Sequence, residues 1–108
     1  MKSVAFGVIA VLASATFVGA QDKVAKGEQV YAANKCALCH SIGDKGNKKG
    51  PLDGVGSKYS AADLKAWIVD AAGMTAKTKS ERKPAMKNYQ LPAEDVDALV
   101  AYMQTLKK

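Results

Sequence analysis

The stretch Cys36-Ala37-Leu38-Cys39-His40, CALCH in one-letter code, contains both cysteines and the only histidine of this 108-residue chain. Cys-x-x-Cys-His is the attachment signature of c-type haem. Two thiols separated by two residues can each add to one vinyl group of the porphyrin, and the next residue is then carried over the porphyrin face. His40 would give a ring nitrogen to the iron as the proximal ligand. The sequence therefore predicts one covalent haem c, attached through Cys36 and Cys39.

Three other uses of such a motif explain the residues less well. A thioredoxin-like redox site requires a βαβ pattern, and no stretch of this chain shows a convincing apolar and polar alternation. A structural zinc site requires four ligands, whereas two cysteines and one histidine supply three. A disulfide accounts for the cysteines and leaves the adjacent histidine unexplained.

A secretory signal peptide is predicted at residues 1–20. Lys2 gives a positive start, an uncharged stretch runs from Val4 to Ala20, and small residues precede the expected cut. An uncleaved membrane anchor is the alternative, because the stretch is at the low end of the length that spans a bilayer. Alanine, glycine and serine dilute its second half, which favours cleavage. Cleavage would leave one exported domain, residues 21–108, with no stable membrane insertion.

The chain is basic, with 16 lysines and arginines against 10 acidic residues and a net charge of +6. Such a surface favours acidic partners, membranes or nucleic acid. One arginine, few aromatic residues and an exported address argue against nucleic acid as the target.

Three stretches have the spacing of amphipathic helices. The first covers about residues 22–35, and its Gly27 is expected where another backbone comes close, since glycine weakens a helix interior by about 1 kcal/mol. The second begins at a capping box of Ser60 and Asp63, and Gly73 is expected to end it. The third follows Pro92, and its buried stripe comprises Val96, Leu99, Val100, Met103 and Leu106.

Residues 43–56 and 74–90 are expected to form loops. Two long loops are uncommon in so small a domain, unless something holds them. A haem is a large apolar body that the loops can wrap, and it would supply part of the core. The predicted fold is therefore mainly α, with three main helices and long loops around one covalent haem.

The sixth ligand of the iron is predicted from the methionines, because the chain has no second histidine. Met86 lies in a loop well after His40, with Pro84 before it, and is the best placed. Met74 is the second candidate for this ligand. Met103 lies on the apolar stripe of the last helix, where packing is its expected role. A lysine ligand or an open site is the remaining alternative.

With these features, residues 22–108 resemble a class I cytochrome c of the small bacterial periplasmic kind. The CALCH motif carries the resemblance, together with KGPLDGVG at residues 49–56, which is similar to the Gly-Pro-x-Leu segment of the family. The resemblance implies that the Pro51 carbonyl accepts a hydrogen bond from His40. Gly27 and Tyr31 resemble the residues by which the first helix of the family crosses the last, and Tyr102 resembles the aromatic residue on the other side.

Trp67 resembles a tryptophan that packs near the haem and bonds a propionate. A core indole on an apolar helix face is the alternative reading of this residue.

The resemblance implies a periplasmic, monomeric one-electron carrier rather than an enzyme, with its redox partners docking at the exposed haem edge through acidic patches. One alternative is a haem subunit of a larger periplasmic oxidoreductase. Another is an open-site haem enzyme or sensor, which would require a distal acid–base group, usually histidine or arginine, and Arg82 is the only arginine.

Overall fold

The computed structural model describes residues 20–108. The predicted signal peptide, residues 1–20, lies outside the described residues apart from Ala20, which begins the first described helix. The elements in chain order are α2 (Ala20–Ala33), the 3₁₀ helix η2 (Cys36–Leu38), β1 (Ser41–Ile42), β2 (Lys45–Gly46), α3 (Val55–Lys58), α4 (Ala61–Val69), α5 (Ala71–Thr78) and α6 (Ala93–Gln104). The expectation of a mainly helical domain is confirmed, with α2, α4 and α6 in the three predicted positions. None of the helices within residues 20–108 combines the length and the apolar character needed to cross a bilayer.

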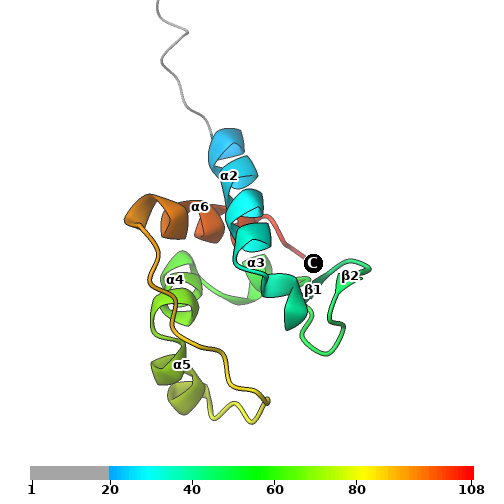
Figure 1. Ribbon diagram of the computed structural model, residues 1–108, viewed down its shortest axis with the longest axis vertical. Helices are drawn as coiled ribbons and strands as arrows, with labels where there is room; N and C mark the ends of the chain where they lie inside the picture. Colours follow the sequence, from blue (N-terminus) through cyan, green and yellow to red (C-terminus); the bar gives the residue numbers. More distant parts are fainter. Residues whose placement is uncertain (1–19) are drawn as a thin grey trace, which may run out of the picture.

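The first and last helices cross closely at Gly27. Figure 1 shows α2 running across α6. A Cβ atom at Gly27 would overlap the backbone carbonyl of Ala98 and the Cβ of Tyr102, so only glycine fits this crossing. Tyr31, one turn further along α2, packs edge-on against Tyr102 with ring centroids 5.9 Å apart. The sequence-based expectation for these residues is confirmed.

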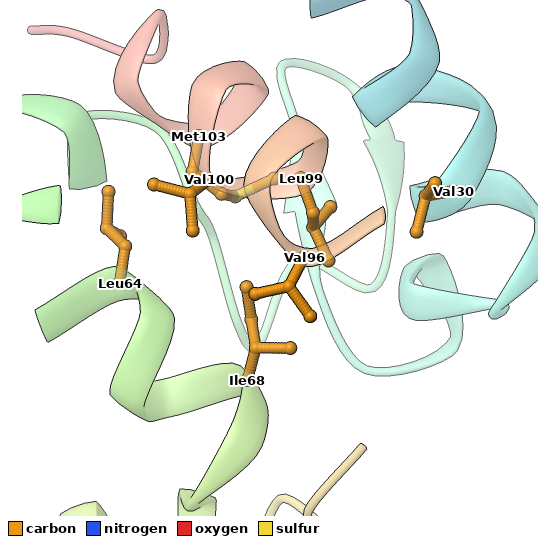
Figure 2. Close-up of a cluster of buried hydrophobic side chains, with 7 residues drawn as sticks. All are labelled: Val30, Leu64, Ile68, Val96, Leu99, Val100 and Met103. Carbon is orange, nitrogen blue, oxygen red and sulfur yellow. The ribbon is translucent and has the colours of Figure 1, made fainter. Parts of the chain in front are cut away.

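The hydrophobic core is centred on α6. Four side chains of this helix point between α2 and α4, as Figure 2 shows. The buried cluster consists of Val30 from α2, Leu64 and Ile68 from α4, and Val96, Leu99, Val100 and Met103 from α6. Leu106, the last residue of the predicted stripe, lies beyond the end of α6 and is partly buried. The stripe thus faces the interior as its spacing predicts.

The second predicted helix is divided into two. The Ser60 hydroxyl accepts a hydrogen bond from the Asp63 backbone N–H at 3.1 Å, so α4 begins where the capping signal places it. The prediction that Gly73 ends this helix is wrong. Asp70 leaves helical geometry, and its carboxylate accepts from the Gly73 N–H at 3.2 Å, which caps a new helix, α5. Residues 74–78, expected to be loop, belong to α5.

The long segment between the CALCH motif and α4 is held by backbone pairing. Ser41 is bridged to Pro51 in a parallel arrangement, in which the Ser41 N–H donates to the Gly50 carbonyl at 3.1 Å and the Leu52 N–H donates to the Ser41 carbonyl at 2.8 Å. The Gly56 N–H, in α3, donates to the Leu106 carbonyl at 2.8 Å, just beyond the end of α6. These contacts fasten the segment after the motif to the motif itself and to the chain's last residues.

Replacing Gly27 by alanine would have two effects of opposite sign on stability. Alanine is the better helix former by about 1 kcal/mol, yet its methyl group would collide with the Ala98 backbone. We expect Gly27→Ala to lower the free energy of unfolding by about 1–3 kcal/mol, as overpacking does, measured by denaturant unfolding. Gln29→Ala on the exposed side of α2 is the control and should change it by less than about 0.5 kcal/mol. A Gly27→Ala protein at least as stable as the parent would rule out the close crossing.

Candidate functional site

A single cavity brings together most of the residues singled out from the sequence. Its volume is about 670 Å³, within the range of about 300–1,000 Å³ found for cofactor pockets. Cys36, Cys39 and His40 line it, as do Met86 from the connection between α5 and α6 and Trp67 from α4. Core side chains of α4 and α6 form its apolar wall, and they are Leu64, Ile68, Leu99 and Met103.

The CALCH motif forms a tight turn directly after α2. Lys35 adopts a left-handed conformation with φ of 55°, and η2 follows it. The backbone N–H of His40 donates to the Cys36 carbonyl at 2.9 Å, which brings the histidine beside the first cysteine. Asn47 braces the turn, because its backbone N–H donates to the His40 carbonyl at 2.9 Å and its side chain donates to the Leu38 carbonyl at 3.1 Å. Both thiols of the motif are therefore held on one turn at the cavity wall.

The two thiols differ in their surroundings. Cys36 is half-buried and Cys39 is exposed, and both are free cysteines. Burial raises the pKa of the Cys36 thiol. Cys39 therefore lies at the mouth of the cavity and Cys36 deeper in its wall.

The His40 ring is oriented by a backbone carbonyl. Its Nδ1 lies 3.0 Å from the carbonyl oxygen of Gly50. A carbonyl only accepts, so Nδ1 carries the proton and Nε2 keeps a lone pair that can bind a metal ion. The prediction that Pro51 supplies this carbonyl is wrong by one residue. Successive carbonyls of an extended chain point to opposite sides, and the pairing with Ser41 turns the Gly50 carbonyl toward the motif. Pro51 itself lines the cavity.

Two causes lower the pKa of the His40 imidazole. Burial lowers its pKa most, and the nearby positive charge of Arg82 lowers it further, while the hydrogen bond to Gly50 acts in the opposite direction. The net shift is downward, which favours the neutral ring that metal coordination requires.

The three methionines of the predicted domain occupy different environments. Met86 is half-buried and lines the cavity. Met74 is buried in α5 and is not among the lining residues. Met103 reaches the cavity wall from the middle of the packed core cluster. Among residues 20–108, Met86 is thus the thioether at the cavity that is not already part of the core.

Two buried polar atoms at the cavity have no partner within the described part of the chain. They are the indole Nε1 of Trp67 and the hydroxyl oxygen of Tyr31. Burial raises the pKa of Tyr31 to about 12, so its phenol stays protonated. A buried donor without an acceptor costs about 1–3 kcal/mol. The interpretation of Trp67 as a simple core indole leaves this cost unexplained, whereas an acidic group beside the indole in the cavity would accept its hydrogen bond.

Sequence reasoning missed Gly50 and Arg82 as site residues. The Arg82 guanidinium donates a hydrogen bond to the Cys39 carbonyl, and a Cβ atom at Gly50 would overlap that guanidinium. The available signal was that Arg82 is the only arginine of the chain and lies four residues before Met86 in a lysine-rich stretch.

The residues present fit a covalent haem. Two thiols lie on one turn, an imidazole has its Nε2 free, and a thioether lies at the same cavity. An apolar wall and two buried donors match a group that is apolar across its body and carries carboxylates at one edge.

Comparison with known proteins agrees with this site. The family model described as Cytochrome c matches residues 24–107. A relative, "Cytochrome c oxidase subunit 2" of Alkalihalophilus pseudofirmus (strain ATCC BAA-2126 / JCM 17055 / OF4), is 31% identical over 91 residues, which cover 76% of this chain and 25% of the relative. The chain thus spans about a quarter of that relative's length, and no solved structure matches it.

The family match covers nearly the whole described chain, and the observed helical fold agrees with it. The chain therefore belongs to the cytochrome c family, with the fold of a class I c-type cytochrome.

Proposed function

We propose that this protein is a periplasmic carrier of single electrons, with one haem c attached to Cys36 and Cys39. His40 and Met86 would hold the iron of this haem. The observation that carries the proposal is that the attachment motif and Met86 line one largely apolar cavity. When bound there, the haem supplies exchange between Fe(III) and Fe(II).

The residues of the chain restrict the iron to that reaction. His40 offers Nε2 because Gly50 holds the proton on Nδ1. Met86 offers a soft sulfur, which favours the reduced iron and raises the reduction potential. Because His40 and Met86 would both bind the iron, oxygen and small substrates would find no open site on it. The apolar wall from α4 and α6 keeps water away from it.

Trp67 and Tyr31 are proposed to hold the acidic edge of the haem. Their buried N–H and O–H groups lack partners among residues 20–108, and both side chains line the cavity. A propionate that accepts one or both hydrogen bonds would remove the cost of these unpaired donors.

The mouth of the cavity at the CALCH turn is proposed as the docking surface for redox partners. Leu38 is 70% exposed there, and Cys39 beside it is exposed. Four cationic side chains also line the cavity, and they are Lys35, Lys58, Arg82 and Lys87. An apolar centre with positive charges around it suits brief docking to acidic patches on a donor and an acceptor. We propose further that the redox partners carry such acidic patches and that the carrier itself is a monomer.

A subunit of an electron-transfer complex is the second candidate. The relative named cytochrome c oxidase subunit 2 favours it, since a chain of that name matches this one over 91 residues. An enzyme with an open iron site is less well supported, because Arg82, the only arginine, is engaged with the Cys39 carbonyl.

Methionine ligation has a direct spectroscopic test. The oxidised parent protein should show the weak far-red charge-transfer band of a methionine–iron bond, and Met86→Ala should abolish it. The reduction potential should fall as well, because the thioether that raises it is gone.

Met74→Leu serves as the control for this test. It replaces a buried methionine by a side chain of similar volume, and the band should remain. A band that survives in Met86→Ala, or one that disappears in Met74→Leu, would contradict the assignment of Met86.

A free carrier and a permanent subunit differ in their response to salt. For a carrier guided by charge, we expect the rate of electron transfer to a membrane fraction that oxidises it to fall about tenfold or more between about 0.01 M and 1 M ionic strength. Lys35→Gln at the cavity should slow the reaction at low salt more than Lys23→Gln on α2, although both remove one charge. A rate that is indifferent to salt, and equal in the two variants, would contradict steering and favour the subunit.

A further inference from the structure

The connection between α5 and α6 holds Met86 with very few hydrogen bonds. It runs outward from α5 and back to α6, in yellow to orange in Figure 1. Residues 83–87 form no hydrogen bond with any residue in 20–108. After Met86, the Asn88 side chain accepts from the Ala72 N–H at 3.0 Å, and the Tyr89 N–H donates to the Ile68 carbonyl at 2.8 Å. The position of Met86 therefore depends on anchors at the two ends of this short segment.

Arg82 is the anchor at the other end. Its guanidinium donates to the backbone carbonyl of Cys39, 43 residues earlier in the chain. The same group lies against Gly50, where a Cβ would overlap both the Arg82 guanidinium and the Cys39 carbonyl. Gly50 also holds the His40 ring. One side chain thus joins the segment that carries Met86 to the turn that carries both cysteines and His40.

We propose that Arg82 is a positioning residue that clamps the Met86 segment onto the CALCH turn and so keeps Met86 at the cavity. This inference rests on the proposed function, in which Met86 is an axial ligand. The clamp does not touch the iron; it acts by limiting how far residues 83–87 swing away from the cavity.

An arginine suits this contact better than a lysine. Its planar guanidinium lies beside the glycine while one nitrogen donates to the carbonyl, whereas an ammonium is a compact and strongly hydrated charge.

The test is the binding of imidazole to the oxidised holoprotein, since imidazole takes the sixth position only when Met86 leaves it. At saturating imidazole the rate reports the opening of the Met86 segment. We expect Arg82→Gln to raise that limiting rate about tenfold, in keeping with the loss of one hydrogen bond from a charged donor. Arg82→Lys should give an intermediate rise. Lys83→Gln, the neighbouring charge with no hydrogen-bond partner in the described chain, should stay within about twofold of the parent.

Hydrogen–deuterium exchange followed by mass spectrometry gives a second measurement. Amides of residues 83–91 should exchange faster in Arg82→Gln, while those of α6 keep the protection of the parent, which separates a local release from general destabilisation. If Arg82→Gln does not assemble with haem, the same comparison is made with Arg82→Lys.

The clamp would be overturned if the Arg82 variants had the same limiting rate of imidazole binding, and the same hydrogen–deuterium exchange at residues 83–91, as Lys83→Gln. A parent protein that lacks the far-red methionine band would instead contradict the proposed ligation by Met86. In that case the exchange measurement still decides whether Arg82 holds the segment, so the two failures are distinguishable.

Discussion

The hydrogen bond from the His40 ring to the Gly50 carbonyl is the contact on which the rest of the site depends. It fixes which ring nitrogen carries the proton and leaves the other free at the cavity. The same carbonyl accepts the Ser41 N–H, so the motif and the segment after it are closed into one unit. The absence of a side chain at Gly50 is what admits Arg82 beside the Cys39 carbonyl. One glycine thereby positions the ring of the proposed proximal ligand directly and the segment of the proposed distal ligand through Arg82.

The helices place the CALCH motif and the segment paired with it against the hydrophobic core. The crossing at Gly27 packs α2 against α6, and only Asn34 and Lys35 separate the end of α2 from the CALCH motif. Helix α6 also supplies Leu99 and Met103 to the cavity wall. The place of the thiols relative to the apolar wall therefore follows from a backbone contact between the two ends of the domain. For a chain this small, a bound apolar group adds hydrophobic surface that its own side chains provide only sparingly.

Local signals predicted much of this arrangement and missed what depends on distant partners. The start of α4 after Ser60 and the positions of the three main helices follow from capping and hydrophobic periodicity, which act within a few residues. Gly73 was misleading, because Asp70 both leaves the helix and caps the next one. The choice of Gly50 over Pro51 depends on the direction of a carbonyl, which the pairing with Ser41 sets. The role of Arg82 depends on a contact across 43 residues that no local pattern encodes.

The proposed electron carrier requires a haem bonded to Cys36 and Cys39. The most direct test is the intact mass of the denatured protein, made in a host that exports the chain and attaches haem to c-type cytochromes. We expect the mass of the polypeptide from residue 21 plus that of one haem, and this added mass should persist after denaturation because the bonds are covalent. In a variant with both cysteines replaced by serine, that added mass should be lost. A mass equal to that of the polypeptide alone for the parent protein would contradict the account.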